Sequence, residues 1–410
     1  MVSMYIVDGT RTPFCKIGTN FEDQSASILG ISAVKNLLVQ SGIDSSVIDE
    51  VIFGCVSQPA DTMNIARVIS VLSNIPESVP AVSVHRNCAS GFEAITSAYE
   101  KAQARQGDVF VVGGVENMSR MPFLYPFSAV KKFTALSKAR TITQKIASIL
   151  NFRPKDFSPE IGIKLGLSDI MCNMNMGQTA ELLAREFNIS REDQDIFAEN
   201  SHQKALFAEN LLKEEISPMY TRNDDCIKSF KGTVVDQDNG PREDSIVSKL
   251  SRLRPVFDRK GTVTAGNSSQ ITDGAAALLL MTRKGLKKTG CKPMCRITSY
   301  AYAGCEPKRM GLGPVHAIKK IGRDPEEADL IEINEAFAAQ TIAVQKSLNI
   351  PNEKLNVNGG AIALGHPVGA SGTRLILTLV KELQRQELKT GLASLCIGGG
   401  QGGAIWLERC

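Results

Sequence analysis

The sequence predicts an α/β protein made of two similar halves, in which helices cover parallel sheets. Short apolar runs typical of buried strands alternate along the chain with segments whose apolar residues recur at helical spacing. The order of these elements in the first part of the chain returns in its last part. Such a repeat predicts two α/β halves packed face to face, so that equivalent joints between strand and helix would meet at one site.

The composition excludes several classes of protein. Of the 410 residues, 43% are hydrophobic and 22% are charged, which is ordinary for a globular enzyme and excludes a disordered or fibrous chain. The net charge is only +4, and no helix-turn-helix, zinc-finger or RNA-binding signature accompanies it, so we expect no nucleic-acid partner.

The sequence also predicts a cellular compartment. It lacks a secretory signal and any apolar run of transmembrane length, so we expect a cytoplasmic protein whose ten cysteines are reduced thiols. Cys291, Cys295 and Cys305 have no histidine close in sequence that would complete a zinc site, and we therefore expect no bound metal.

The first half begins with a strand at Tyr5–Val7 and a helix. Apolar residues at helical spacing would form the inward face of this helix: Ile28, Ile31, Val34 and Leu37. A strand at Val51–Phe53 follows, and then a helix that begins near Asn64. A later strand, Val109–Val112, is closed by two glycines.

Cys88 stands at another joint between a strand and a helix. Ala81–Val84 reads as a short buried strand, and Phe92 and Ile95 recur at helical spacing after it. The small residues Ala89–Gly91 let the backbone turn sharply and let a ligand approach. Because a helix N-terminus favours negative charge, a thiol at this place tends to become a thiolate. Cys88 is therefore a candidate nucleophile, and the alternative is a small buried cysteine that fills a gap.

The second half repeats this plan. Asp329–Asn334 corresponds to Asp49–Gly54, since in each case a helix end runs into a strand. Ala370–Gly372 corresponds to Ala89–Gly91, and each segment opens a helix. Two glycines again follow the last strand, at Gly398–Gly399.

A region of different composition, residues 118–271, separates the halves. Within it, Arg120–Lys155 holds eight basic and no acidic residues, with apolar residues between them: Phe127, Val130, Phe133, Leu136, Ile142, Ile146 and Ile149. A basic amphipathic segment can lie on an anionic membrane or dock a partner helix. The alternative is a lid that packs on the core and meets the phosphates of an acidic ligand. We divide the chain into an N-terminal half (1–117 plus 272–293), this inserted loop domain and a C-terminal half (294–410).

Four separated segments carry reactive or polar groups in glycine-rich surroundings: Cys88, Asn334–Phe337, Gly365–Pro367 and Cys396–Gly400. A cysteine nucleophile needs a base, and His366 is the candidate because its loop is the repeat partner of the Cys88 loop. His202 and His316 lie in polar, helix-like surroundings and are expected at the surface.

These motifs, in this order, resemble those of the thiolases. The matching segments are Asn87–Gly91, Asn334–Phe337, Asn358–Gly372, Cys396–Gly400, Arg254–Asn267 and Asp273–Ala276. The resemblance covers nearly the whole chain. It implies the thiolase fold, in which duplicated βαβαβαββ halves form a five-layer α-β-α-β-α arrangement with an inserted loop domain.

The resemblance implies ping-pong acyl transfer between thiols, with coenzyme A as co-substrate and no permanently bound cofactor. His366 would deprotonate Cys88, which attacks the 3-keto carbonyl of a 3-oxoacyl-CoA. Cys396 would exchange the proton at C2 of acetyl-CoA, and coenzyme A would then take the acyl group from Cys88. The reaction needs two oxyanion sites. One would use His366 with a water held by Asn334, and the other the backbone amides of Cys88 and Gly398.

The resemblance also places coenzyme A against the inserted region. Ser269 matches the residue that contacts the pantetheine arm, and Met176 and Phe337 match residues that line the channel. Arg242 matches a residue near the adenine nucleotide phosphates, with a solvated loop arginine as the alternative.

Two subgroups of the family match in part. The basic insert, together with Asn239–Arg242 and Asn267–Ser269, resembles the β subunit of the fatty-acid oxidation trifunctional complex, which implies a hydratase/dehydrogenase partner subunit or membrane contact. However, Asn334 stands where that subunit usually carries histidine, and Asn175 where short-chain biosynthetic enzymes carry histidine. We favour a degradative 3-ketoacyl-CoA thiolase of β-oxidation, with a biosynthetic acetyl-CoA acetyltransferase as the alternative.

Two other classes deserve comparison. A decarboxylating condensing enzyme that acts on acyl carrier protein shares the implied fold but would be expected to lack Cys396 and the His366 loop in this form. A non-catalytic acyl-CoA-binding protein would have no reason to keep Cys88 together with both of these groups. Since thiolases are dimers or tetramers, we expect a homodimer or homotetramer.

Overall fold

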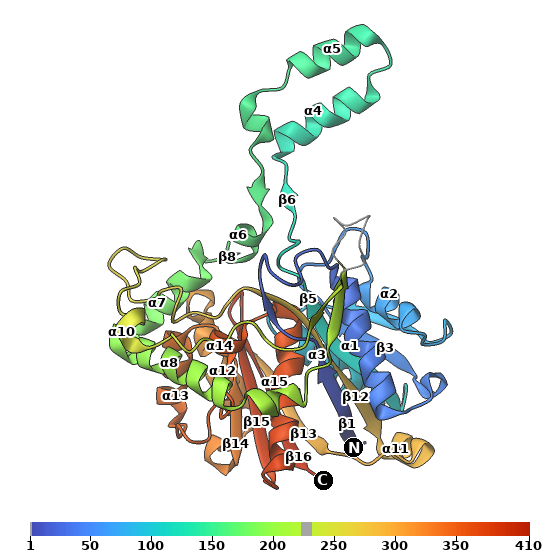
Figure 1. Ribbon diagram of the computed structural model, residues 1–410, viewed down its shortest axis with the longest axis vertical. Helices are drawn as coiled ribbons and strands as arrows, with labels where there is room; N and C mark the ends of the chain where they lie inside the picture. The colour runs from blue at the N-terminus through green and yellow to red at the C-terminus, as the bar shows by residue number, and fades with distance from the viewer. Residues whose placement is uncertain (1, 223–231) are drawn as a thin grey trace.

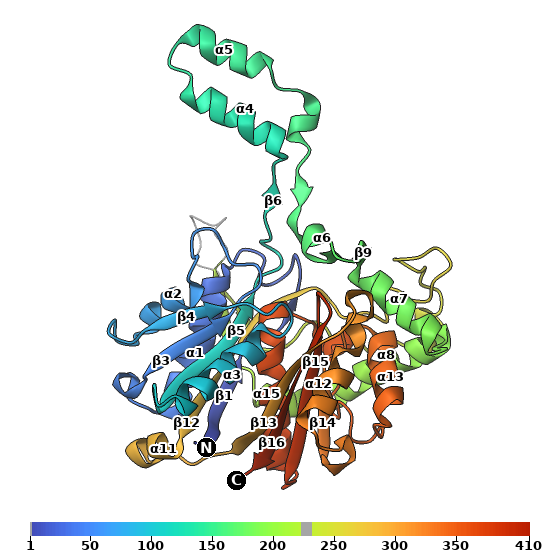
Figure 2. The ribbon, with the colours of Figure 1, turned by 180° about the vertical axis from the view of Figure 1, so that it is seen from behind.

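One mixed sheet forms the body of the molecule. The structure is a computed structural model that describes residues 2–222 and 232–410. The sheet strands of the first half are β1 (Met4–Arg11), β2 (Cys15–Lys16), β3 (Glu50–Gly54), β4 (Ala81–Val84), β5 (Val109–Glu116) and β12 (Thr272–Thr282). Those of the second half are β13 (Cys295–Gly304), β14 (Leu330–Ile333), β15 (Thr390–Ile397) and β16 (Gln401–Arg409). The strands run in the order β4-β3-β5-β12-β1-β13-β16-β15-β14, and β2 pairs with β12 (Figures 1 and 2).

The strand pairing repeats between the halves. β3 and β5 are parallel in the first half, as β14 and β15 are in the second. β12 then returns antiparallel to β5, and β16 antiparallel to β15. The halves join where β1 pairs antiparallel with β13, from Met4 opposite Ile297 to Ile6 opposite Cys295. The predicted α/β class and the duplication are confirmed. The prediction of parallel sheets is only partly right, because β1, β12, β13 and β16 pair antiparallel with their neighbours.

Helices form the other layers. α3 (Ser90–Gln103) and α15 (Val368–Arg385) pack on each other between the two halves of the sheet, and their apolar side chains form the central core with Phe92, Ile95, Leu375 and Leu379. α1 (Ala26–Ser41) and α2 (Ile65–Leu72) cover the outer face of the first half, and α12 (Gly313–Ile321) covers that of the second. The first turns of α3 and α15 therefore lie close together in the middle of the molecule.

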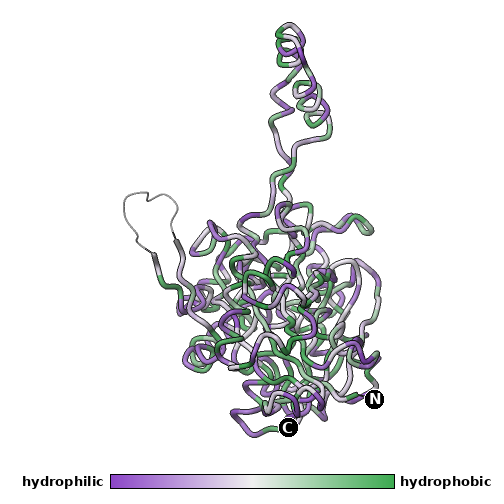
Figure 3. The backbone as a smooth tube through the Cα atoms, turned by 90° about the vertical axis from the view of Figure 1, so that its right-hand side faces the viewer, coloured by the Kyte–Doolittle hydropathy of each residue, from purple (hydrophilic) through white to green (hydrophobic). Residues whose placement is uncertain are grey.

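The inserted region begins with an arm that projects from this body (Figures 1, 2 and 3). We define the arm as residues 123–161, which contain β6 (Phe123–Leu124), α4 (Phe127–Lys138), α5 (Ile142–Leu150), the 3-10 turn η2 (Pro154–Phe157) and β7 (Glu160–Ile161). The pair β6 and β7 forms its stem, and the rings of Phe133 and Phe152 pack with centroids 4.8 Å apart. The arm projects away from the body, and its role as a lid stays a prediction.

The rest of the inserted region lies against the body. Its elements are α6 (Gly162–Gly166), β8 (Ser168–Asp169), β9 (Met174–Asn175), α7 (Met176–Glu186), α8 (Arg191–Phe207), α9 (Glu209–Lys213), β10 (Met219–Arg222), β11 (Gly232–Val235) and α10 (Val247–Leu250). The remaining elements are α11 (Arg283–Thr289), α13 (Ala338–Leu348), α14 (Ala361–Leu364) and the 3-10 turns Ser45–Val47, Pro307–Leu312 and Pro325–Glu327. None of the helices within 2–222 and 232–410 has both the length and the apolar character needed to cross a bilayer. The division at residues 117, 271 and 293 stays a prediction.

Three local predictions differ from the structure. β4 is a strand as predicted but only partly buried, because it lies at the sheet edge with β3 as its one neighbour. On α1, Ile28 is 45% exposed, and Leu29 and Ala33 share the buried face with Val34 and Leu37 instead. β5 continues through Gly113 and Gly114 to Glu116, because its pairing with β12 extends that far. Position 114 needs glycine, because a Cβ there would collide with the carbonyl of Gly369.

Candidate active site

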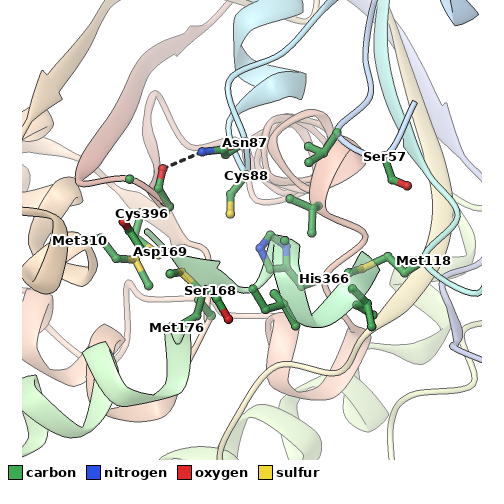
Figure 4. A pocket seen from close by; sticks show the side chains of 18 of the residues that line it. Ser57, Asn87, Cys88, Met118, Ser168, Asp169, Met176, Met310, His366 and Cys396 are labelled. Atoms are coloured by element: carbon green, nitrogen blue, oxygen red, sulfur yellow. Dashed lines mark hydrogen bonds between the residues drawn. The ribbon is translucent and has the colours of Figure 1, made fainter. Parts of the chain in front are cut away.

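A cavity of about 340 Å³ opens between the two halves, beside the N-terminal ends of α3 and α15 (Figure 4). Its lining includes most of the residues predicted for the site: Cys88, His366, Cys396, Gly398, Ser269, Met176 and Phe337. Asn334 lies behind His366, and Arg242 lies in a second cavity. The two strand-to-helix joints thus meet, as the repeat predicted.

Cys88 lies between β4 and α3 and is partly accessible from the cavity. Its sulfur points toward the imidazole of His366, and Cys396 lies on its other side (Figure 4). Burial raises the pKa of the Cys88 thiol above its usual value, although the backbone N–H groups of Gly398 and of Cys88 itself hydrogen-bond to it and oppose the rise. Burial thus opposes the tendency of the helix N-terminus to favour a thiolate.

His366 precedes the first turn of α15, and its ring is held at both nitrogens. Nδ1 lies 2.6 Å from Oγ of Ser371, and that hydroxyl donates to the carbonyl of Pro367 at 2.9 Å. Because the hydroxyl has one proton to give, the ring donates from Nδ1 and keeps a lone pair on Nε2. Nε2 lies 3.3 Å from Nδ2 of Asn334. Burial, with a contribution from the charge of Arg374, lowers the pKa of His366 to about 4, so the ring is a neutral acceptor.

Cys396 is the second thiol of the cavity. It lies near the end of β15 with 1% of its surface exposed. Burial raises its pKa well above the usual value, and the neighbouring Cys88 adds to the rise. The chain then turns through Gly399 and Gly400, whose φ angles of 91° and 80° favour glycine. Burial thus favours the protonated form of both thiols, which lie on either side of the site.

Asn87 was not singled out from the sequence, although it lies in the matched motif. Its Nδ2 donates to the carbonyl of Gly398 at 2.7 Å, which ties the Cys88 loop to the loop after β15. It adopts φ 44°, and Oγ of Ser90 donates to its carbonyl at 2.7 Å. Asparagine tolerates this left-handed conformation better than most residues, and that preference is the signal that could have identified it.

Glu116 is a second residue that the sequence analysis missed. Its buried carboxylate ends β5 and accepts the backbone N–H groups of Ser57 at 2.8 Å, Gly369 at 3.0 Å and Val56 at 3.1 Å. Burial raises its pKa to about 7 against the opposing effect of these three donors. Glu116 thereby joins the first half to the first turn of α15. An acidic residue at the end of a strongly apolar strand was the available signal.

Asn334 follows β14 and is fully buried. Its Oδ1 makes no hydrogen bond within residues 2–222 and 232–410. Its neighbour Glu335 is also buried and accepts from Oγ of Ser201 at 2.6 Å and from Nδ2 of Asn356 at 2.9 Å. This network fixes the segment that carries Asn334 against His366.

Arg242 lines a second cavity, of about 400 Å³, with Lys16, His202 and Lys249. It pairs with Asp244, with 3.0 Å between Nε and Oδ1. Consecutive residues line the two cavities, Ser269 the first and Gln270 the second.

The two surface histidines predicted from the sequence fall into different environments. His316 is exposed as predicted. His202 is only 4% exposed, and its Nδ1 accepts the backbone N–H of Arg242 at 3.2 Å. Burial lowers the pKa of His202 to about 4. The prediction failed because a segment some 40 residues further along the chain covers this face of α8.

The described residues contain neither a candidate metal site nor a disulfide. Within the described residues no three histidine, cysteine or carboxylate side chains form a group that could hold a metal ion. The nine cysteines found there are all free thiols, and Cys226 lies outside the described residues.

Known proteins match this chain over nearly its whole length. Residues 4–284 match the family described as "Thiolase, N-terminal domain", and residues 291–409 match "Thiolase, C-terminal domain". A probable acetyl-CoA acyltransferase of Staphylococcus aureus (strain COL) is 40% identical over 409 residues, which cover 98% of each chain. A probable acetyl-CoA acyltransferase of Staphylococcus epidermidis is 39% identical over 417 residues, which cover 100% of this chain and 99% of the relative.

Solved structures show the same likeness. The Bacillus anthracis acetyl-CoA acetyltransferase superposes with a TM-score of 0.90 at 35% identity and covers 100% of this chain and 99% of its own. Human mitochondrial 3-ketoacyl-CoA thiolase in complex with CoA gives a TM-score of 0.87 at 34% identity, over 100% of this chain and 98% of its own. The fold, the order of the motifs and both family matches agree. The chain therefore belongs to the thiolase family of acyltransferases.

Proposed function

We propose that the chain cleaves 3-oxoacyl-CoA with coenzyme A, giving acetyl-CoA and a shortened acyl-CoA, in fatty-acid β-oxidation. The observation that carries this proposal is a single cavity that contains two thiols and a neutral imidazole, Cys88, Cys396 and His366. An imidazole that keeps a lone pair on Nε2 can accept a proton from a thiol, and a second thiol can protonate the carbon that leaves.

In the first half-reaction, Nε2 of His366 takes the proton of Cys88 and the sulfur attacks C3 of the substrate. The bond between C2 and C3 then breaks, leaving an acyl group on Cys88 and an enolate at C2. Cys396 gives its proton to C2, and acetyl-CoA leaves. Both thiol pKa values are raised and that of His366 is lowered, so this proton transfer is unfavourable at rest. We propose that bound substrate makes it favourable by giving the electron pair of the sulfur a carbon to attack.

In the second half-reaction, the Cys396 thiolate takes the proton of coenzyme A, whose sulfur attacks the acyl group on Cys88. The Cys88 thiolate then leaves and recovers its proton from His366. The backbone amides of Cys88 and Gly398 are the proposed donors to the tetrahedral oxyanion, which the hydrogen bonds to Sγ support. A water on Oδ1 of Asn334, with His366, is the proposed site for the enolate oxygen, which the unpaired Oδ1 supports.

Coenzyme A is the proposed ligand of both cavities. Ser269, Met176 and Phe337 line the first and would contact the pantetheine arm. Arg242, with Lys16 and Lys249 in the second, would meet the phosphates, and the sign of these charges supports that role. The similar human mitochondrial thiolase has been solved with CoA bound.

The test is a thiolysis assay that follows the loss of 3-oxoacyl-CoA absorbance on addition of coenzyme A. We expect turnover by the wild type and none by Cys88→Ala, which should also show no acyl adduct by mass spectrometry. An acyl adduct on the Cys88→Ala variant would refute the assignment of Cys88 as the nucleophile. A biosynthetic acetyl-CoA acetyltransferase is the alternative function, and a strong kcat/KM preference for acetoacetyl-CoA over longer substrates would favour it.

The arm is the proposed site of a partner or membrane contact. Phe127, Ile142 and Leu150 are 71%, 75% and 79% exposed. Within the described residues, Lys138 and Lys145 form no ion pair. Hydrophobic and hydrophilic positions alternate along the arm (Figure 3). These features support an anionic membrane or an amphipathic partner subunit. The likeness to a trifunctional-complex β subunit, the homodimer or homotetramer and the cytoplasmic location stay predictions.

A further inference from the structure

The two amides proposed for the tetrahedral oxyanion come from opposite halves of the molecule. Cys88 lies between β4 and α3, whereas Gly398 follows β15. Asn87, the neighbour of Cys88, is 311 residues from Gly398 in sequence. Local chain geometry therefore does not set the distance between the two N–H groups. Donors to an oxyanion are effective when they are fixed in place before the charge develops, so a tertiary contact must align these two.

The segment that carries the second amide is flexible by composition. β15 turns into β16 through Gly398, Gly399 and Gly400, which we call the glycine loop. Glycine restricts the backbone less than any other residue, and this loop has no side chains that could pack. Hydrogen bonds must therefore hold it. At its far end, the carbonyl of Gly400 accepts the N–H of Cys305 at 2.8 Å.

Asn87 holds the near end of the glycine loop. Its Nδ2 donates to the carbonyl of Gly398 at 2.7 Å (Figure 4). The N–H of the same glycine hydrogen-bonds to Sγ of Cys88. Two consecutive residues of one half thus bind both backbone polar groups of one glycine of the other half. This arrangement directs the N–H of Gly398 to the reacting sulfur.

The backbone of Asn87 is held independently of its side chain. Its carbonyl accepts the N–H of Ser90 at 3.0 Å and Oγ of Ser90 at 2.7 Å. Ser90 is fully buried in the first turn of α3. The φ angle of Asn87, 44°, lies in the left-handed region, which glycine adopts without strain. Asn87→Gly therefore removes the side-chain amide and keeps the loop that carries Cys88.

We infer that Asn87 is a positioning residue, whose side-chain amide holds the N–H of Gly398 beside that of Cys88 so that both donate to the tetrahedral oxyanion. This inference rests on the proposed function. Asn87 acts through Gly398 and transfers no proton. Its loss should therefore slow the steps that pass through the tetrahedral oxyanion.

The groups proposed for the enolate steps are held by other contacts. His366 bonds to Ser371 and lies 3.3 Å from Nδ2 of Asn334. Cys396 belongs to β15 and pairs with Gly402 of β16, so the strand ladder fixes it before the glycine loop begins. The loss of the Asn87 amide should therefore leave proton exchange at C2 nearly unchanged.

The test compares two partial reactions of acetyl-CoA. In the first, the acetyl group moves from coenzyme A to Sγ of Cys88 and back, which is measured as exchange of labelled coenzyme A into acetyl-CoA. The second is deuterium uptake at C2 from deuterated water after preincubation with acetyl-CoA. Asn87→Gly should slow the first about 10- to 100-fold and change the second by less than about threefold, because a displaced donor costs up to as much as a missing one. Asn87→Asp keeps the side-chain shape but has no N–H to donate, and it should slow the first reaction at least as much.

Asn173→Gly is the matched control, because it makes the same change at an exposed asparagine with φ 53°, in the loop between β8 and β9. Both of its rates should match the wild type. Unchanged exchange of coenzyme A in Asn87→Gly, an equal loss of both reactions, or the same loss in Asn173→Gly would each overturn the inference. Wild-type thiolysis that depends on Cys88 would still uphold the proposed function in those cases, whereas its absence on every substrate would refute both.

Discussion

Removing the hydroxyl of Ser371 should disable the base without touching the substrate. Ser371 is 1% exposed, and its Oγ lies 2.6 Å from Nδ1 of His366. Ser371→Ala leaves a buried N–H without an acceptor, which costs about 1–3 kcal/mol. The ring can avoid this cost by moving its proton to Nε2, which lies 3.3 Å from Nδ2 of Asn334 and could then no longer accept the Cys88 proton. The productive tautomer is then disfavoured by the same energy, and kcat/KM should fall about 5- to 150-fold.

The assay is thiolysis at saturating and at limiting 3-oxoacyl-CoA, combined with ¹⁵N NMR of the imidazole. We expect kcat to fall with little change in KM, and the NMR signals to show a larger share of the Nε2–H form. Ser371→Thr keeps the hydroxyl and should recover most of the activity. Ser371→Ala with kcat/KM within twofold of the wild type, or with an unchanged tautomer, would refute the assignment of Nε2 as the base.

Three further predictions concern other groups. Since burial raises the pKa of Cys88, iodoacetamide should alkylate the free enzyme faster as the pH rises beyond 8.5, and a rate that levels off below pH 8 would contradict this. Arg242→Ala should raise the KM for coenzyme A roughly tenfold with kcat retained, because a charged hydrogen bond to phosphate is lost, whereas Asp244→Ala should leave KM unchanged or lower it. Replacing residues 127–150 by a short glycine-serine link should retain thiolysis of acetoacetyl-CoA but abolish sedimentation with phosphatidylserine vesicles at low salt. Equal sedimentation of both proteins would argue against membrane contact through the arm.

The part of the site that the duplicated halves form could be predicted from the sequence. Equivalent joints in two similar halves must lie at equivalent ends of their sheets, so the pairing of Cys88 with His366 followed from the repeat. The roles of these residues stay proposals, but the structure brings their side chains into one cavity with Cys396. Arg242 lies apart from them, because the segment that carries it packs over His202.

Residues that hydrogen-bond to backbone groups far away in the sequence could not be predicted in the same way. Glu116 accepts hydrogen bonds from Ser57 and Gly369, about 60 and 250 residues away in sequence. No local sequence pattern indicates such partners. Asn87 reaches Gly398 across the boundary between the halves. The role of the arm could not be predicted from the sequence either, since its amphipathic pattern fitted a lid, a membrane contact or a partner contact equally well.

The sequence by itself determined the α/β class, the duplicated order of strands and helices, and the family, because periodicity and motif order are local properties of the chain. Only the tertiary structure decided that burial raises the pKa of Cys88, that His202 is buried and that the arm stands away from the body. Protonation and exposure depend on which remote segments cover a side chain, and burial can oppose the local effect of a helix end.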